Sequence, residues 1–382
     1  MLTNDPPDVS SDLDSLCSAV FLAYFRTHTP PCTLHIPLAN LQREDLALRP
    51  ELRAVLRPAG LETKDLLTLT DLPDLRPEST RWLLVDHNAL TGALSGPFGD
   101  RLVGCIDHHE DEGRIPRETG GEPRIIEVSG SCMSLVVNHC RERWGELGAD
   151  KTVDAALAHL ALGPILVDTV NLTSKDKTKE SDVRAAAFAE GLIAGTAEST
   201  ESLSTRAAEE DGGNAGYDRT AYWKEINRLK EEIGDMSFRD ILRKDYKEWT
   251  DGGLKLGMST IVQGFDFLLD KAAAERVDFV EEMRRWAEEQ ALDVVGAMTL
   301  SHPNGVFTRQ LLVWATGPES IPAVRQFVSR NKERLELKPW GDGKLDLDQP
   351  REWRQCWTNS QGCSRKQIAP LLREAMKDSP KL

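Results

Sequence analysis

A chain of 382 residues is too long for one ordinary hydrophobic core, so two domains are expected. Its formal net charge of −15 argues against binding to long nucleic acid, because a phosphate backbone would be repelled. The seven cysteines include no Cys-x-x-Cys pair, and no apolar run approaches the roughly 20 residues that span a bilayer. The sequence also shows no signal-peptide pattern. These observations predict a cytoplasmic protein without membrane contact.

The first predicted helix covers residues 11–27, where apolar side chains recur at the spacing of one helix face. Asp14 or Ser15 stands where the N-cap of this helix belongs. Two interpretations of the nearby acids stay open. Asp12 and Asp14 are a loop acid and a helix cap, or the Asp-x-Asp pair reaches one hard cation from a strand-to-helix turn.

Two later apolar runs end in clusters of polar residues. They follow a predicted short strand at 33–36 and a polar helix near 43–48. The apolar run at 81–85 leads into Asp86, and the run at 102–106 leads into Asp107-His108-His109. Continuous apolar runs are typical of strands buried on both faces of a parallel sheet, and such sheets bind ligands at their carboxyl ends. A strand followed by an ordinary polar turn would use similar residues at 86–88.

A further strand from Arg124 leads into a Ser-Gly-Ser turn and a helix over 131–144. The turn places backbone N–H groups at a helix start, which suits an anion, although a tight turn alone would need the same residues. The Ala/Leu-rich helix at 154–167, kinked or ended by Pro164, delivers Asp168 after another apolar run. Another helix is expected at 178–194.

Residues 196–216 are polar and contain almost no large apolar side chain, so a flexible linker is expected there. The predicted domains are therefore residues 1–195 and 217–382. The second domain is expected to contain a charged helix at 222–233, strands at 254–263, 293–300 and 309–316, and one helix at 273–290. Its basic segments near Lys247 and Arg365 are either solvated turns or anion-binding groups.

The acids and imidazoles of the first domain follow apolar segments whose ends should meet at one edge of a sheet. They are Asp12, Asp14, Asp86, His108, His109 and Asp168. Converging carboxylates repel one another unless cations lie between them, and mixed carboxylate and imidazole ligands suit Mn²⁺, Co²⁺ or Mg²⁺ better than structural zinc. Two such metals sharing one carboxylate would activate a water for attack on phosphorus.

These motifs resemble the DHH phosphoesterase superfamily, in the branch of family II inorganic pyrophosphatases, cytosolic exopolyphosphatases and prune proteins. The resemblance covers nearly the whole chain and rests on Asp-Leu-Asp-Ser (12–15), Asp-His-Asn (86–88), Asp-His-His-Glu-Asp-Glu-Gly (107–113), Gly-Ser-Cys-Met-Ser (130–134), Leu-Val-Asp-Thr (166–169), Leu-Arg-Lys-Asp-Tyr-Lys (242–247) and Ser-Arg-Lys-Gln (364–367). Ile36-Pro37 and Arg49-Pro50-Glu51 are more similar to the exopolyphosphatase branch. The resemblance implies an α/β fold: an N-terminal parallel-sheet domain, a smaller C-terminal α/β domain, and an active site in the cleft between them.

The resemblance also implies a role for each candidate residue. The ligands of two divalent metal ions would be Asp12, Asp14, Asp86, His108 and Asp168, with Asp86 as the bridge. His109 would contact the substrate phosphate and assist proton transfer to the leaving oxygen. The terminal phosphoryl group would be held by Lys247, Arg365 and Lys366. Asp107 is expected to orient His108.

The family places a His or Asn four residues before the first acid. Asp8 occupies that position here, and Asn4 could fill the role if the Pro6-Pro7 region is an insertion.

The leading functional hypothesis is a metal-dependent hydrolase that releases orthophosphate from the ends of inorganic polyphosphate. Pyrophosphate hydrolysis, or a prune-like activity on short polyphosphates or nucleotides, is the alternative with the same residues. A RecJ-like nuclease is disfavoured because no Gly-Gly-Gly-His motif is present. A degenerate, non-enzymatic binding protein is the remaining alternative. The sequence indicates no oligomeric state.

Overall fold

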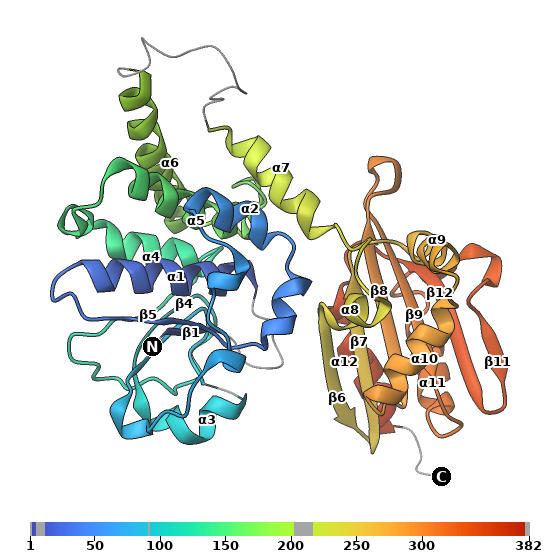
Figure 1. The fold of residues 1–382 in the computed structure, drawn as a ribbon. Helices are drawn as coiled ribbons and strands as arrows, with labels where there is room; N and C mark the ends of the chain where they lie inside the picture. The colour runs from blue at the N-terminus through green and yellow to red at the C-terminus, as the bar shows by residue number, and fades with distance from the viewer. Residues whose placement is uncertain (1, 5–11, 91, 202–216, 379–382) are drawn as a thin grey trace. The chain divides into compact units, whose positions relative to one another are not determined.

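The structure is a computed structural model that describes residues 2–4, 12–90, 92–201 and 217–378 (Figure 1). The chain divides into two compact units, Met1–Lys230 (unit 1) and Glu231–Leu382 (unit 2). Within the described ranges, no helix combines the length and apolar character needed to cross a membrane.

A parallel sheet forms the base of unit 1, as predicted. Its strands are β1 (Leu2–Asn4), β2 (Pro37–Ala39), β3 (Trp82–Val85), β4 (Leu102–Asp107) and β5 (Arg124–Ile126). They lie in the order β2-β1-β3-β4-β5, and every neighbouring pair is parallel. The short strand expected at 33–36 lies at Pro37–Ala39 instead, because these residues pair with β1 and bury Leu38.

Helices cover both faces of this sheet. They are α1 (Leu13–His28), α2 (Leu52–Leu56), α3 (Gly92–Phe98), α4 (Cys132–Arg141), α5 (Lys151–Asp168), α6 (Glu180–Glu201) and α7 (Arg219–Lys230), with a 3-10 helix at Arg43–Leu48. Figure 1 shows α1 and α4 on one face and α3 on the other. Side chains alternate accordingly: Leu83 and Val85 belong to the α1/α4 core, whereas Trp82 and Leu84 pack on α3.

The contacts divide the chain after Lys230, whereas the predicted domains meet at residues 196–216. Helix α6 continues to Glu201, so the first part of the expected linker is helical, and residues 202–216 lie outside the described ranges. Helix α7 was expected to open the second domain, but it belongs to unit 1. Its fully buried Ile226 packs in the core of unit 1, and the Tyr222 hydroxyl donates to the His159 carbonyl at 3.0 Å.

Unit 2 is a second, mixed sheet with helices on both faces. Its strands are β6 (Tyr246–Asp251), β7 (Leu254–Ile261), β8 (Val294–Ser301), β9 (Thr308–Ala315), β10 (Lys338–Pro339), β11 (Leu347–Gln349) and β12 (Glu352–Asn359). The order is β10-β12-β9-β8-β7-β6, with β11 paired to β12. Only β7 and β8 are parallel within this described sheet.

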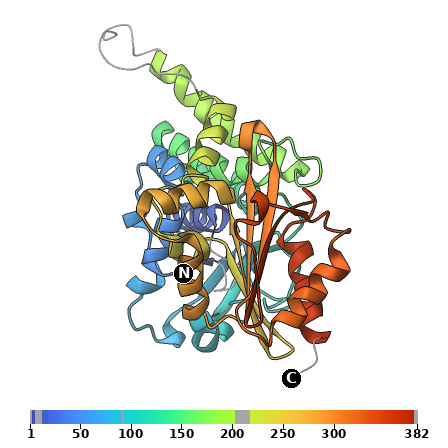
Figure 2. The ribbon, with the colours of Figure 1, turned by 90° about the vertical axis from the view of Figure 1, so that its right-hand side faces the viewer.

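The helices of unit 2 are α8 (Phe238–Arg243), α9 (Phe265–Glu275), α10 (Phe279–Glu289), α11 (Ile321–Asn331) and α12 (Arg365–Asp378). One core lies under α8, α9 and α10, and the other lies under α11 and α12. Figure 2 shows the sheet between the orange α10 and the red α12. The single helix predicted at 273–290 is two helices, because Arg276 takes a left-handed conformation (φ 59°) and Asp278 caps α10.

Candidate functional site

The candidate residues of the first unit meet around one cavity of about 360 Å³. It is lined by Asp12, Asp14, Asp86, His108, His109 and Asp168, among others. These residues come from the start of α1, the carboxyl ends of β3 and β4, and the end of α5. The structure therefore brings together all six residues that the sequence placed at this sheet edge.

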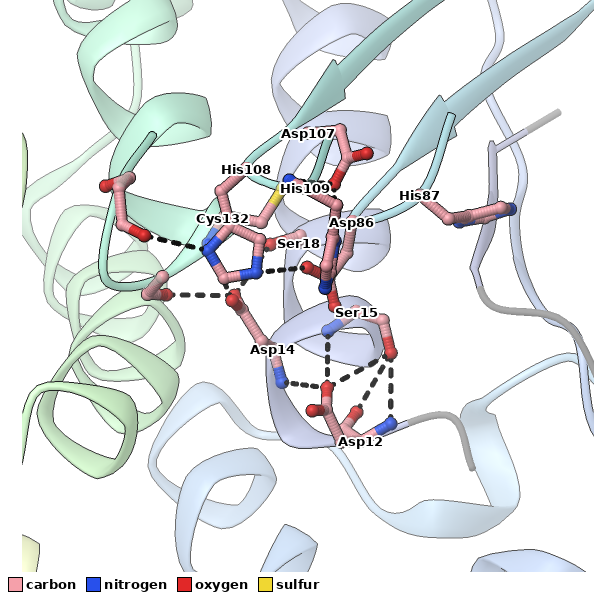
Figure 3. Close-up of polar contacts among 12 residues, drawn as sticks. Asp12, Asp14, Ser15, Ser18, Asp86, His87, Asp107, His108, His109 and Cys132 are labelled. Carbon is pink, nitrogen blue, oxygen red and sulfur yellow. Dashed lines mark hydrogen bonds and ion pairs between the residues drawn. The ribbon is translucent and has the colours of Figure 1, made fainter. Parts of the chain in front are cut away.

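Asp12, and not Asp14 or Ser15, is the N-cap of α1. Its Oδ1 accepts hydrogen bonds from the backbone N–H groups of Asp14 (3.0 Å) and Ser15 (3.2 Å). The buried Asp14 carboxylate turns to the start of α4, where it accepts from the N–H groups of Cys132 (2.6 Å) and Met133 (2.9 Å). Each acid is thus fixed at the cavity by the N-terminus of a helix, where the helix dipole favours negative charge (Figure 3).

Of the two interpretations of the Ser-Gly-Ser turn, the site for an external anion does not hold, because carboxylates of the protein already accept from its N–H groups. Asp182 Oδ2 accepts from Gly130 at 2.9 Å, and Asp182 Oδ1 accepts from Ser131 at 3.2 Å. The next two N–H groups bind Asp14, as described above. Asp182 is fully buried in the first turn of α6, and sequence reasoning missed it because an acid there is ordinary.

Asp86 and His108 face each other in the cavity (Figure 3). Asp86 Oδ1 lies 3.2 Å from His108 Nε2, and the other ring nitrogen of His108 contacts the Ser129 carbonyl at 3.1 Å. A carbonyl oxygen only accepts hydrogen bonds, so Nδ1 is the donor, and Nε2 is the ring nitrogen that faces Asp86 and the cavity. Asp86 itself adopts a left-handed backbone (φ 65°), a strained conformation that is typical of functional positions.

Asp107 orients His109, so the prediction that it orients His108 is wrong. Asp107 Oδ1 accepts from His109 Nδ1 at 2.8 Å, and Asn88 Nδ2 donates to Asp107 Oδ2 at 2.5 Å. Burial raises the pKa of Asp107, but the hydrogen bonds from His109 and Asn88 outweigh it and leave this pKa below its usual value. The same bond raises the pKa of His109. Because Nδ1 is bonded to Asp107, Nε2 is the ring nitrogen of His109 that can contact a ligand in the cavity.

His87 takes no part in this cluster. The buried His87 ring contacts the Val85 carbonyl at 2.8 Å and points away from the other side chains (Figure 3). Burial lowers its pKa to about 4, so it is neutral at pH 7. Asp8 lies outside the described residues, and Asn4 is the last residue of β1.

The donor set fits hard divalent cations. Burial raises the pKa of Asp14 and, more strongly, that of Asp168, and the neighbouring carboxylates raise both further. Asp86, His108 and His109 each offer one ligand atom, and these atoms lie within 4.8 Å of one another. Crowded carboxylates repel one another, and this repulsion raises their affinity for protons. A divalent cation between them would relieve the repulsion.

The same cavity is lined by a loop that sequence reasoning missed, with Asp176, Lys177 and Lys179. Three lysines at alternate positions (175, 177 and 179), shortly after Asp168, are the signal that could have found it.

The basic residues of unit 2 lie close to β6. Arg365, the first residue of α12, donates from Nη1 to the Asp245 carbonyl at 2.9 Å and from Nη2 to Asp245 Oδ1 at 2.7 Å. Lys247 follows two residues later on β6, and Lys366 is exposed next to Arg365. The Asp245 contact therefore ties Arg365 to the strand that carries Lys247.

A larger cavity, of about 840 Å³, lies at the opposite edge of the sheet of unit 1, near the starts of β3 and β4. Its lining includes Arg26 and His139 from the last turns of α1 and α4. Basic side chains are common at helix C-termini, and Arg26 is already bonded to Glu122 and His35. This cavity lacks the carboxylate cluster, so the smaller one is the candidate site.

Comparisons with known proteins find relatives whose similarity extends over both units. A DHHA2 domain model matches residues 224–375. A Schizosaccharomyces pombe protein, provisionally named an exopolyphosphatase, is 29% identical over 378 residues, which cover 96% of this chain and 89% of the relative. Human exopolyphosphatase PRUNE1 is 24% identical over 375 residues, covering 96% of this chain and 73% of the relative.

The manganese-dependent inorganic pyrophosphatase of Methanothrix thermoacetophila is 25% identical over 281 residues, covering 71% of this chain and 77% of its own. Among solved structures, a Methanococcus jannaschii protein, provisionally described as a family II inorganic pyrophosphatase, matches 96% of this chain and 97% of its own with a TM-score of 0.52 and 18% identity. At this identity the structural match establishes the fold alone.

Proposed function

The resemblance of this chain to the exopolyphosphatase and prune branch of the DHH phosphoesterases is confirmed, and from it we propose that the protein is a phosphoanhydride hydrolase that releases orthophosphate from the ends of inorganic polyphosphate. The observation that carries this proposal is the convergence of four carboxylates and two imidazoles on one cavity of unit 1. The cytoplasmic location stays a prediction.

Two divalent cations, Mn²⁺ or Mg²⁺, are proposed as cofactors. Asp12, Asp14, Asp86, His108 and Asp168 would hold them, with Asp86 shared. When bound, such ions lower the pKa of a water and neutralise charge on phosphoryl oxygens. The N-termini of α1 and α4 keep Asp12 and Asp14 in place, and the Ser129 carbonyl holds Nδ1 of His108, so that Nε2 lies on the cavity side.

His109 is proposed to contact the substrate phosphate and to deliver a proton to the leaving oxygen. Asp107 holds its Nδ1–H, which turns Nε2 toward the cavity, and the raised pKa of His109 favours the protonated ring. Because Asn88 donates to the same carboxylate, the orientation of His109 depends on a buried hydrogen-bonded chain.

Pyrophosphate hydrolysis is the second candidate function. The observation that favours it is the similarity to a protein named a manganese-dependent inorganic pyrophosphatase. The same cavity residues would serve both substrates, so the two functions differ in what holds the rest of the phosphate chain.

Phosphate release from a panel of substrates tests these proposals. Purified protein with Mn²⁺ or Mg²⁺ is given long polyphosphate, tripolyphosphate, pyrophosphate and a dinucleotide. We expect release from the polyphosphates, loss of release after chelation with EDTA, and recovery when Mn²⁺ is restored. Release from pyrophosphate alone would move the assignment to the second candidate. No release from any substrate, with metal shown to bind, would contradict the enzyme proposal.

The basic group of unit 2, Lys247, Arg365 and Lys366, is proposed to bind the terminal phosphoryl group. Lys366→Ala is expected to raise KM about tenfold, because one charge-assisted contact to phosphate is lost. Metal content, measured by elemental analysis, should stay unchanged. Lys344→Ala is the control, since Lys344 is also exposed and adjoins Leu345 in the opposite-face core. Loss of metal from Lys366→Ala would contradict this role.

A further inference from the structure

The loop after α5 is built firmly into the wall of the candidate site. The Lys179 N–H donates to Asp182 Oδ2 at 2.7 Å, and the Thr178 hydroxyl donates to the Thr169 carbonyl at 3.3 Å. The loop also packs closely on the neighbouring turn, because a Cβ added to Gly130 would lie 2.7 Å from the Lys177 carbonyl oxygen. Asp182 therefore fixes both the Ser-Gly-Ser turn and this loop.

Two lysines of this loop line the cavity, but only the ammonium of Lys179 forms a hydrogen bond within the loop. Lys179 Nζ donates to the Asp176 carbonyl at 2.7 Å, so its ammonium helps to close the turn. Lys177 is exposed, and among the described residues no hydrogen bond or ion pair engages its ammonium. Its charge nevertheless acts on the site, since it counters part of the burial that raises the pKa of Asp168.

The cavity has room for more than one phosphoryl group. At about 360 Å³ it has the volume of roughly a dozen water molecules. Five carboxylates line the cavity, with Asp176 of this loop among them, so a phosphate chain in the cavity is repelled unless cations lie beside it. A lysine is suited to this place, because its flexible ammonium binds phosphate as a point charge without demanding one geometry.

We propose that Lys177 binds the inner phosphates of a polyphosphate chain whose terminal group lies at the carboxylate cluster. This inference rests on the proposed function and adds a determinant of chain length on unit 1. Pyrophosphate has no inner phosphate, so Lys177 distinguishes three or more phosphoryl groups from two. The alternative is that Lys177 is merely a solvated lysine at the rim.

The test compares Lys177→Gln with Lys175→Gln, a matched control on the same loop. Lys175 is also exposed, and it does not line the cavity. For Lys177→Gln we expect KM for tripolyphosphate and longer chains to rise about five- to tenfold, kcat to change less than about twofold, and the rise to shrink at high salt. KM for pyrophosphate and the metal content should match the wild type. Lys175→Gln should resemble the wild type throughout.

Binding of analogues that resist hydrolysis separates this inference from the proposed function. Imidodiphosphate and diimidotriphosphate carry two and three phosphoryl groups, and their affinities are measured by calorimetry with Mn²⁺ present. We expect Lys177→Gln to weaken only the longer analogue, whether or not the wild type turns over substrate. Equal weakening of both analogues, or no difference from Lys175→Gln, would overturn the inference. Absence of turnover with this binding difference intact would count against the proposed function alone.

Discussion

Replacing Asp86 by asparagine is expected to reduce phosphate release by about 10³-fold or more, because several kcal/mol of stabilisation by the proposed metal centre would depend on its charge. Asn is the informative substitution here. Asp86 has a left-handed backbone (φ 65°), which Asn tolerates almost as well as Asp, so the fold should be retained. The loss then reports the missing carboxylate beside His108 and not a strained turn.

Steady-state phosphate release, metal content and thermal unfolding are measured together for this variant. Asp100→Asn serves as the control, since Asp100 is exposed and lies outside the lining of the cavity. His108→Ala should give a loss of similar order through the same centre. Asp86→Asn with near wild-type turnover would remove Asp86 from the proposed metal site.

Asp182→Asn is expected to lower the free energy of unfolding by about 2–5 kcal/mol, because it leaves buried donors without an acceptor. The fully buried Asp182 carboxylate accepts from the N–H groups of Gly130, Ser131 and Lys179 and from the Ser129 hydroxyl. An amide offers one acceptor oxygen, and its NH₂ group would face N–H donors. Turnover of the remaining folded protein should also fall, because this turn carries the carbonyl that orients His108.

Chemical denaturation measures this change, with Glu180→Gln as the control in the same helical turn. Glu180 is exposed, and its contact with Arg184 is a surface pair of 3.4 Å, so its replacement should cost about 0.5 kcal/mol or less. If Asp182→Asn unfolds at the same denaturant concentration as the control, Asp182 does not hold the two loops together.

Local patterns in the sequence were enough to predict the edge of the sheet and the acids that lie at it. The strands before Asp86 and His108 are short, continuously apolar runs, and a parallel sheet must place their carboxyl ends side by side. Asp12, Asp14 and Asp168 could be added because each adjoins an apolar segment of the same unit. The packing of helix α7 on unit 1 could not be predicted, because its buried stripe, including Ile226, is narrow within a charged sequence.

The hydrogen-bond partners of individual polar atoms could be identified only from the tertiary structure. The sequence placed the N-cap at Asp14 or Ser15, whereas Asp12 caps α1, and the Asp14 carboxylate instead accepts from the start of α4, far along the chain. The partner of Asp107 was likewise ambiguous between two adjacent histidines.

The sequence by itself determined the fold class of unit 1 and which residue types meet at the carboxyl edge of its sheet, because hydrophobic periodicity acts over short stretches of chain. Only the tertiary structure decided how the carboxylates share their hydrogen bonds, that Asp182 supports the site, and that Lys177 lines it. Hydrogen bonds between residues 50 or more positions apart depend on side-chain directions in the packed molecule, which no local pattern carries.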